Sequence, residues 1–203
     1  MTKLIIVRHC QAQGNLERFF QGNIDTDITP KGREQIDKTA RMLSAEPIDV
    51  FYTSYKKRAI KTTDGINLYH NVPVINDERL TEIDAGKWEG MHLTEIAEVF
   101  PEEFDNWNNH PERFHAPDGE SMAQVYDRVS SALRDIVRDN DGKTVCIVSH
   151  GCAIKCIMCY LHGYKVDDIG LIKLGTNTSV NVVKADSSMN TKIIIENYAD
   201  HLS

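Results

Sequence analysis

Two histidines and two arginines occupy positions from which they could act together on a phosphoryl group. Arg8 and His9 follow a short apolar run at the N-terminus, and His150 follows a similar run much later in the chain. Arg58 lies one helical turn beyond the end of a third run. Phosphoryl transfer needs fixed cations, paired hydrogen-bond donors and a nucleophile, and guanidinium and imidazole groups supply all three. Two histidines together with two arginines therefore favour chemistry on a phosphate over a purely structural role.

Three apolar runs must bring these side chains together. Residues 4–7, 48–52 and 144–148 are rich in apolar and β-branched side chains, and we predict that each forms a buried strand. A helical pattern follows each run, which is typical of a three-layer α/β/α fold with a mostly parallel central sheet. Since such folds gather their sites at the carboxyl ends of the strands, Arg8-His9 and Ser149-His150 should converge at one edge.

The predicted helices have recognisable starts and apolar faces. Thr29-Pro30 provides a cap and a proline in the first turn, and apolar residues then recur at helical spacing. Further apolar stripes predict helices over about 93–100, 122–136 and 153–161. These helices are the elements expected to cover the two faces of the sheet.

Two segments complete the predicted domain. Residues 179–184 and 192–197 are rich in β-branched side chains and favour a hairpin or two neighbouring strands at the edge of the sheet. Residues 101–120 contain three prolines among polar and aromatic residues, which fits either a cap over a site or an irregular surface loop. We expect residues 1–203 to form one domain, with about 90–120 as an inserted cap or lid.

Seven short motifs occur in one order along almost the whole chain, from residue 3 to about 185. They are Arg8-His9, Asn15, Gln21-Gly22 with Asp27 to Gly32, Ser54 to Thr62, Leu80 to Gly90, Pro117 to Ser121, and Ser149-His150-Gly151. In this order and spacing they resemble the histidine phosphatase superfamily, which is also called phosphoglycerate-mutase-like. Each motif alone is weak, but the set is specific, and it implies a phosphoglycerate-mutase-like fold with a small cap.

The resemblance and the chemistry agree on the roles of the central residues. His9 would attack phosphorus and form a phosphohistidine, which water would then hydrolyse. Arg8, Arg58 and His150 would hold the non-bridging oxygens. Glu82 would protonate the leaving oxygen and later take a proton from the attacking water.

Four further residues are expected to bind substrate. The resemblance places Asn15 beside the phosphate as a hydrogen-bond donor, and it adds Gln21, Gly22 and Gly151 to the lining of the site. No metal site and no cofactor is predicted, since the chain lacks a His- or Asp-rich cluster of ligand spacing. Three cysteines between residues 152 and 159 are better explained as buried thiols on one face of a helix.

Three positions depart from the family pattern. Cys10 replaces the glycine of the R-H-G motif, Ala12 stands where many members carry threonine, and Tyr55 replaces a proline. None of these changes removes a group with a proposed chemical role. Cys10 leaves two alternatives open: a thiol made reactive by the neighbouring cations, or a buried and inert one.

Phosphatases and mutases of this superfamily share the same central residues. Cofactor-dependent mutases carry a longer insertion and extra basic residues after the acid, whereas Glu82 is followed here by Ile83-Asp84-Ala85. We therefore expect a phosphatase of small-molecule phosphate monoesters, resembling the broad bacterial phosphatases of the α-ribazole phosphatase type. The alternatives are a cofactor-dependent phosphoglycerate mutase and a non-catalytic module that binds a phosphorylated ligand on the same fold.

Composition restricts the partners. The formal net charge is −7 and no basic tract is present, so nucleic acid is not an expected partner. The chain has neither a signal-peptide pattern nor an apolar stretch of membrane-spanning length. It contains five cysteines, an odd number. These features favour a cytoplasmic protein away from the membrane, with a small phosphate ester as its partner and a homodimer as one possible assembly.

Overall fold

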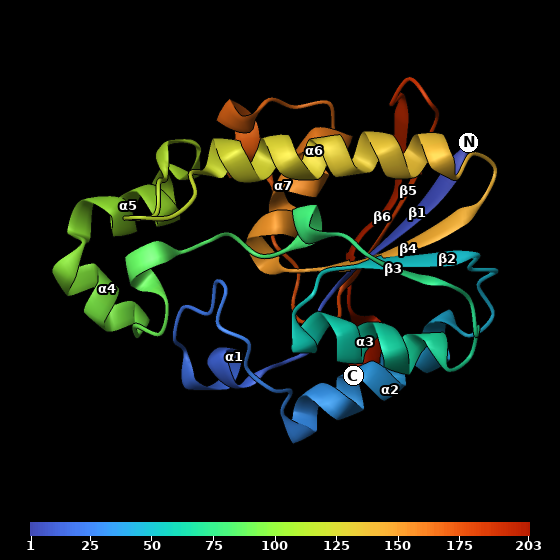
Figure 1. The fold of residues 1–203 in the computed structure, drawn as a ribbon, viewed down its shortest axis with the longest axis horizontal. Helices are drawn as coiled ribbons and strands as arrows, with labels where there is room; N and C mark the ends of the chain where they lie inside the picture. The colour runs from blue at the N-terminus through green and yellow to red at the C-terminus, as the bar shows by residue number, and fades with distance from the viewer.

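A computed structural model describes all residues, 1–203, and contains a central sheet covered by helices on both faces (Figure 1). The six strands lie in the order β3-β2-β4-β1-β5-β6. The strands are β1 (Thr2–Arg8), β2 (Val50–Thr53), β3 (Val74–Asn76), β4 (Thr144–Ser149), β5 (Val180–Ala185) and β6 (Thr191–Tyr198). The pairs among β1, β2, β3 and β4 are parallel, while β5 pairs antiparallel with both of its neighbours. The predicted α/β fold with a mostly parallel sheet is confirmed.

The chain contains seven helices. They are α1 (Gln13–Glu17), α2 (Pro30–Leu43), α3 (Lys57–Asn67), α4 (Leu93–Val99), α5 (Pro101–Asn109), α6 (Met122–Asp139) and α7 (Gly151–Leu161). Five 3₁₀ turns complete the chain: η1 (Glu78–Leu80), η2 (Gly86–Trp88), η3 (Pro111–Arg113), η4 (Val166–Leu171) and η5 (Asp200–Leu202). Helices α6 and α7 cover one face of the sheet, and α2 and α3 cover the other (Figure 1).

Local sequence explains where the longer helices begin. The Thr29 hydroxyl accepts a hydrogen bond from the backbone N–H of Gly32, and Pro30 occupies the first turn of α2. At the start of α6, Ser121 and Gln124 cap each other reciprocally. Both helices bury their apolar stripes against the sheet, which holds them in place more firmly than their helix propensity would.

The two central strands fix the position of the site. Every residue of β4 is buried, and β1 pairs with it in parallel so that Arg8 lies opposite Ser149. The backbone N–H of His9 continues this pairing by donating to the carbonyl of Ser149 at 2.8 Å. The residue that follows each strand, His9 or His150, is therefore delivered to the same edge of the sheet.

The segment between η2 and α6 lies beyond the first turn of α6, at the end of the molecule away from β3 (Figure 1). Part of it, Pro101–Asn109, is helix α5 rather than an irregular loop, because Pro101 and two acidic residues occupy the first turn. The ring of Trp107 packs 4.8 Å from that of Phe114 and 5.0 Å from that of Phe20, centroid to centroid. This aromatic packing joins the segment to the rest of the domain.

None of the helices has both the length and the apolar character needed to cross a membrane.

Candidate active site

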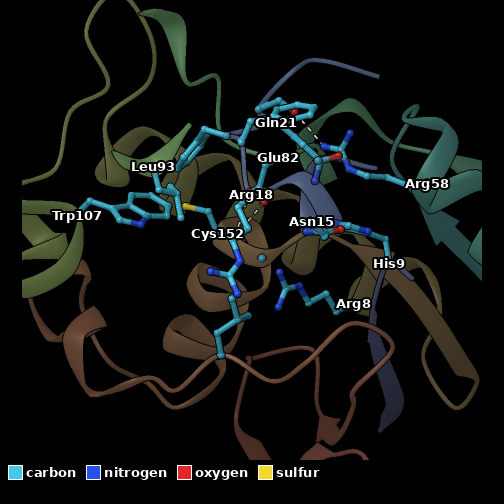
Figure 2. Close-up of a pocket in the computed structure, with 16 residues that line it drawn as sticks. Arg8, His9, Asn15, Arg18, Gln21, Arg58, Glu82, Leu93, Trp107 and Cys152 are labelled. Atoms are coloured by element: carbon cyan, nitrogen blue, oxygen red, sulfur yellow. Dashed lines mark hydrogen bonds between the residues drawn. The ribbon is translucent and has the colours of Figure 1, made fainter. Parts of the chain in front are cut away.

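The buried His9 lines a cavity of about 290 Å³ at the carboxyl edge of the sheet (Figure 2), and the buried His150 lies beside it. The centroids of the His9 and His150 rings lie 5.1 Å apart, and the rings are tilted by 52°. The side chain of His9 faces the cavity between those of Arg8 and Arg58. The structure thus brings together the two histidines and two arginines that the sequence predicts to converge.

The hydrogen bond of His9 defines which of its ring nitrogens is available. Nδ1 lies 2.6 Å from the carbonyl oxygen of Cys10, which can only accept, so Nδ1 carries the hydrogen. Burial, reinforced by the positive charges of Arg58 and Arg8, lowers the pKa of His9 well below its usual value. At neutral pH the ring is therefore neutral, with an unshared electron pair on Nε2.

His150 is held by two protein partners. The Arg58 Nε donates to His150 Nδ1 at 3.2 Å, and Nε2 lies 2.5 Å from the hydroxyl of Ser54. Burial and the nearby charge of Arg58 lower the pKa of His150 well below its usual value, so this ring is also neutral. Because both ring nitrogens are engaged, His150 can bind a phosphoryl oxygen only by exchanging one of these bonds.

Arg58 is buried and Arg8 is partly buried, and backbone carbonyls hold both guanidinium groups at the cavity. Arg58, which is 1% exposed, donates to the carbonyls of Ile24 and Gly22, and Arg8 donates from Nη1 to Gly175 at 2.8 Å. The Arg8 Nε is buried without a hydrogen-bond partner in the protein. Such a donor suits an anionic ligand, because an unpaired buried N–H is otherwise destabilising.

Glu82 lies against the first turn of α7. Its carboxylate accepts from the backbone N–H groups of Ile83, Cys152 and Ala153 at 3.0 to 3.2 Å. A methyl group at Gly151 would lie 3.5 Å from both Arg8 Nη2 and Glu82 Oε2, so glycine keeps the space between these two side chains open. The helix start therefore fixes Glu82 beside the cations without a bulky group intervening.

The other expected substrate-binding residues line the same cavity. The Asn15 carbonyl oxygen accepts from the Ala12 N–H, and that of Gln21 accepts from the Thr26 hydroxyl. Both side-chain NH₂ groups are thereby left to face a ligand. Gly22 has a φ of 47°, and a methyl group there would lie 2.5 Å from a carboxylate oxygen of Glu89, so the turn requires glycine.

The outer wall of the cavity contains residues that the sequence did not single out. Its apolar members are Phe19, Phe20, Leu93, Trp107 and Leu174, and Arg18 is its cation. Phe19 and Phe20 could have been found from their place between Asn15 and Gln21. Leu174 follows η4, and nothing in its local sequence indicates a site.

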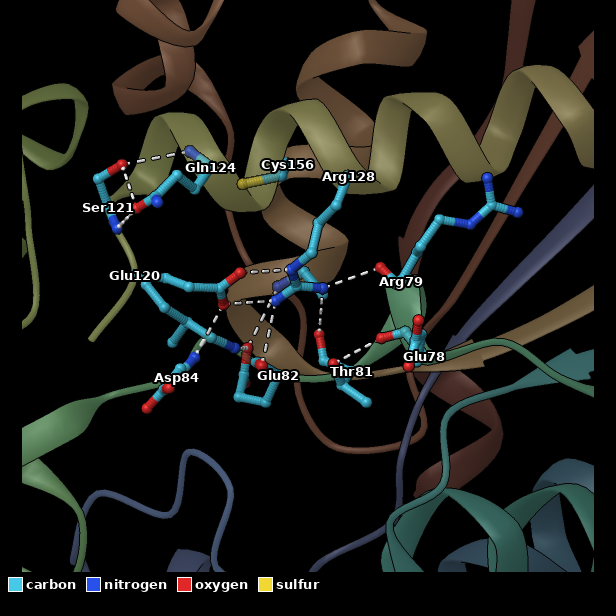
Figure 3. A network of polar contacts seen from close by, with 12 residues as sticks. Glu78, Arg79, Thr81, Glu82, Asp84, Glu120, Ser121, Gln124, Arg128 and Cys156 are labelled. Atoms are coloured by element: carbon cyan, nitrogen blue, oxygen red, sulfur yellow. Dashed lines mark hydrogen bonds and ion pairs between the residues drawn. The ribbon is translucent and has the colours of Figure 1, made fainter.

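A second arginine network holds the backbone that carries Glu82 (Figure 3). The guanidinium of Arg128, on α6, donates to the carbonyls of Arg79, Thr81 and Glu82 at 2.8 to 3.1 Å. It also forms two bonds to the carboxylate of Glu120, which in turn accepts from the N–H of Asp84. Arg128 thus fixes the turn that presents Glu82 to the cavity.

Cys10 is not part of the cavity. Its thiol is buried beside Thr62 and Gly32, and burial raises its pKa to about 11. Of the two alternatives left by the sequence, the reactive thiol is therefore contradicted by the structure. The reason is that the Cys10 thiol lies in the packing between its loop, Gly32 of α2 and Thr62 of α3.

The remaining cysteines, Cys146, Cys152, Cys156 and Cys159, are buried and form no disulfide. No group of three His, Cys, Asp or Glu side chains lies close enough together to hold a metal ion.

The sequence model of the Histidine phosphatase superfamily (branch 1) matches residues 4–196, and the chain belongs to this family. It is accordingly an enzyme of the phosphoglycerate-mutase-like phosphatases. Phosphoserine phosphatase 1 of Hydrogenobacter thermophilus is 37% identical over 163 residues, which cover 80% of this chain and 77% of that protein. A 2,3-bisphosphoglycerate-dependent phosphoglycerate mutase of Cytophaga hutchinsonii is 30% identical, covering 87% and 84% respectively.

Solved structures agree with this assignment. Bacillus stearothermophilus YhfR superposes with a TM-score of 0.94 at 30% identity, over the full length of both chains. A phosphoserine phosphatase of Entamoeba histolytica, solved with phosphoserine, superposes with a TM-score of 0.87 at 25% identity, also over both full lengths. The expected resemblance to α-ribazole phosphatases is weaker. An alpha-ribazole-5'-P phosphatase candidate of Escherichia coli is 19% identical over 97% of this chain and 96% of its own, with a TM-score of 0.87, and shares the fold alone.

Proposed function

We propose that this enzyme hydrolyses small-molecule phosphate monoesters through a phosphohistidine on His9. The observation that carries the proposal is the neutral, buried His9 ring, whose Nδ1–H is bound to the Cys10 carbonyl and whose Nε2 faces the cavity between two arginines. A neutral imidazole nitrogen among fixed cations is both nucleophilic and close to where the phosphoryl group would bind.

The first step transfers the phosphoryl group to the enzyme. The electron pair on His9 Nε2 forms a bond to phosphorus in line with the ester bond, which breaks and leaves its electrons on the alcohol oxygen. Glu82, in its protonated form, donates a proton to that oxygen, and the alcohol departs. Arg8 and Arg58 neutralise the non-bridging oxygens, with Asn15 and Gln21 as further donors.

The second step regenerates the enzyme. Glu82, now a carboxylate, accepts a proton from a water molecule whose oxygen attacks phosphorus. The bond from phosphorus to Nε2 breaks, inorganic phosphate leaves, and His9 returns to its neutral form. No metal ion takes part in either step.

We propose phosphoserine as the first substrate to test. The support is the similarity to proteins named phosphoserine phosphatases, one of which was solved with phosphoserine bound.

The mutase alternative has less support from the site. Ile83 and Ala85 are fully buried, and the Asp84 carboxylate accepts from the N–H of Gly86, so this segment offers no cation to a second phosphate. We expect little interconversion of 2- and 3-phosphoglycerate, even with 2,3-bisphosphoglycerate supplied. Mutase turnover comparable to the best phosphatase turnover would reverse this assignment.

We also propose that residues 1–203 act as one domain in which about 90–120 caps the site. Leu93 and Trp107, from this segment, line the cavity beside the expected position of the leaving group.

The test is a panel of phosphate monoesters assayed in EDTA, combined with rapid quench of a labelled substrate. We expect activity in EDTA and a protein-bound label that is lost in acid and stable in base, absent from His9→Asn. Acid-stable label, or activity abolished by EDTA, would contradict the mechanism. Binding without turnover would favour a non-catalytic module.

A further inference from the structure

One cation of the cavity has no part in the proposed mechanism. The Arg18 side chain lines the same cavity as Arg8 and His9, and its guanidinium forms no ion pair or hydrogen bond within the protein (Figure 2). By contrast, Arg8 and Arg58 each donate to backbone carbonyls. Arg18 is thus the one arginine of this cavity whose donors are all directed to solvent or to a ligand.

The backbone of Arg18 is firmly held. Arg18 ends α1 in the left-handed conformation, with a φ of 59°, a position where glycine or asparagine is usual. Its carbonyl accepts from the N–H of Leu93, and the next residues continue the pairing through Phe20 and Met91 at 2.9 Å. The guanidinium therefore extends from a site fixed to the first turn of α4, and binding would not require that backbone to be ordered.

The surroundings of Arg18 define what it could bind. The rest of the outer wall is apolar and includes Phe19, Leu93 and Leu174, so it can contact the carbon skeleton of a leaving group. A guanidinium beside apolar walls favours a carboxylate, whose two oxygens match its paired N–H groups. The single positive charge of Arg18 balances a carboxylate, which carries one negative charge, better than a second phosphate dianion, which carries two.

We infer that Arg18 binds a carboxylate on the alcohol part of the substrate, and so selects phosphorylated hydroxy acids over esters of neutral or purely cationic alcohols. This inference rests on the proposed phosphatase function and assigns its specificity to one residue. A cavity of about 290 Å³ has room for a phosphoryl group and a short acidic alcohol of this kind.

A second free cation, the side chain of Lys155, offers a matched control. Lys155, one turn along α7 from Gly151, lines an adjoining cavity of about 170 Å³ with Trp107 and Pro111, and it also forms no ion pair. If the carboxylate extended into that smaller cavity, Lys155 rather than Arg18 would carry the selectivity. Arg18→Met and Lys155→Met remove one charge each at similar side-chain length, so the comparison separates the two positions.

The experiment compares two esters that differ only in the carboxylate, O-phosphoserine and O-phosphoethanolamine. A charge-assisted pair contributes enough to favour the carboxylate ester by about tenfold to a hundredfold in kcat/KM. The measured quantity is kcat/KM for O-phosphoserine divided by kcat/KM for O-phosphoethanolamine. We expect Arg18→Met to reduce this ratio by tenfold or more and Arg18→Lys to reduce it less. Lys155→Met should leave it unchanged. Thermal unfolding of each variant verifies that the fold is retained.

Three results would overturn the inference: no preference in the unmodified enzyme, equal losses on both esters in Arg18→Met, or loss of the preference in Lys155→Met. A binding measurement separates this inference from the proposed function. The dissociation constants of the two esters are compared in His9→Ala with and without Arg18→Met. A preference that depends on Arg18 supports the inference even where turnover fails, and equal binding of the two esters refutes it.

Discussion

His9 and His150 lie ring against ring, 5.1 Å apart, and neither is more than 2% exposed. Burial lowers the pKa of both rings well below the usual value, and the charge of Arg58 lowers both further. Two imidazolium ions could not be accommodated in this space together with Arg58. The structure therefore requires both rings to be neutral, and this requirement has a consequence for stability.

We predict that the free energy of unfolding decreases as the pH falls from 6.5 to 5. In the unfolded chain these histidines take up protons near pH 6.5, whereas in the folded protein they do so only at lower pH. The unfolded state then binds more protons, so stability is lost on acidification, by up to about 1.4 kcal/mol per pH unit for each histidine. Urea unfolding across this range measures the slope.

Replacing the exposed His115 by Asn serves as the control and should leave the slope unchanged. His150→Asn should make it shallower. A free energy of unfolding that is constant between pH 6.5 and 5 would contradict the neutral histidine pair.

Glu82→Gln should affect substrates unequally. An alkoxide is a poor leaving group that needs a proton, whereas p-nitrophenolate hardly does. General acid assistance typically contributes ~10²–10⁴-fold, so we expect about that loss on alkyl phosphates and a much smaller one on p-nitrophenyl phosphate. The measurement is kcat/KM on both esters. Equal losses would remove Glu82 from the acid role.

Arg128→Met should reproduce part of the Glu82→Gln pattern although Arg128 does not line the cavity. Three carbonyls and the Glu120 carboxylate would lose their donors, which should lower the free energy of unfolding by about 2–4 kcal/mol. Since the turn bearing Glu82 would loosen, activity on alkyl phosphates should fall more than activity on p-nitrophenyl phosphate. Arg134→Met, an exposed change on the same helix, is the control, and a uniform loss on both esters would indicate a purely structural role.

Cys10→Ser should leave peroxide sensitivity unchanged. The thiol is buried and its pKa is raised to about 11, so very little thiolate is present at neutral pH. The rate of inactivation by peroxide is compared for the two proteins at pH 7. Marked protection by the substitution would show that the thiol is accessible after all.

Much of the site followed from the sequence because parallel strands place their carboxyl ends together. The apolar runs before His9 and His150 correspond to β1 and β4, and their pairing explains why the two histidines meet. The predicted edge hairpin is also present, as β5 and β6.

The features of the fold and the site that the sequence did not predict depend on tertiary contacts. Strand β3 has only three residues, all exposed, and is defined by pairing with β2 rather than by an apolar pattern. Arg18 and Leu174 come to the cavity from a short helix end and a loop, where no periodicity exists to indicate direction. Cys10 was open to misinterpretation because adjacency to His9 in sequence does not fix which way a loop side chain points.

The pairing of β1 with β4 also determines when the site can form during synthesis of the chain. Arg8 and Ser149 are neighbours in the sheet although 141 positions separate them in the chain. During synthesis from the N-terminus, His9 emerges early, but its partner strand β4 follows only in the last third of the chain. The site that joins the two strand ends can therefore form only after most of the chain has been synthesised.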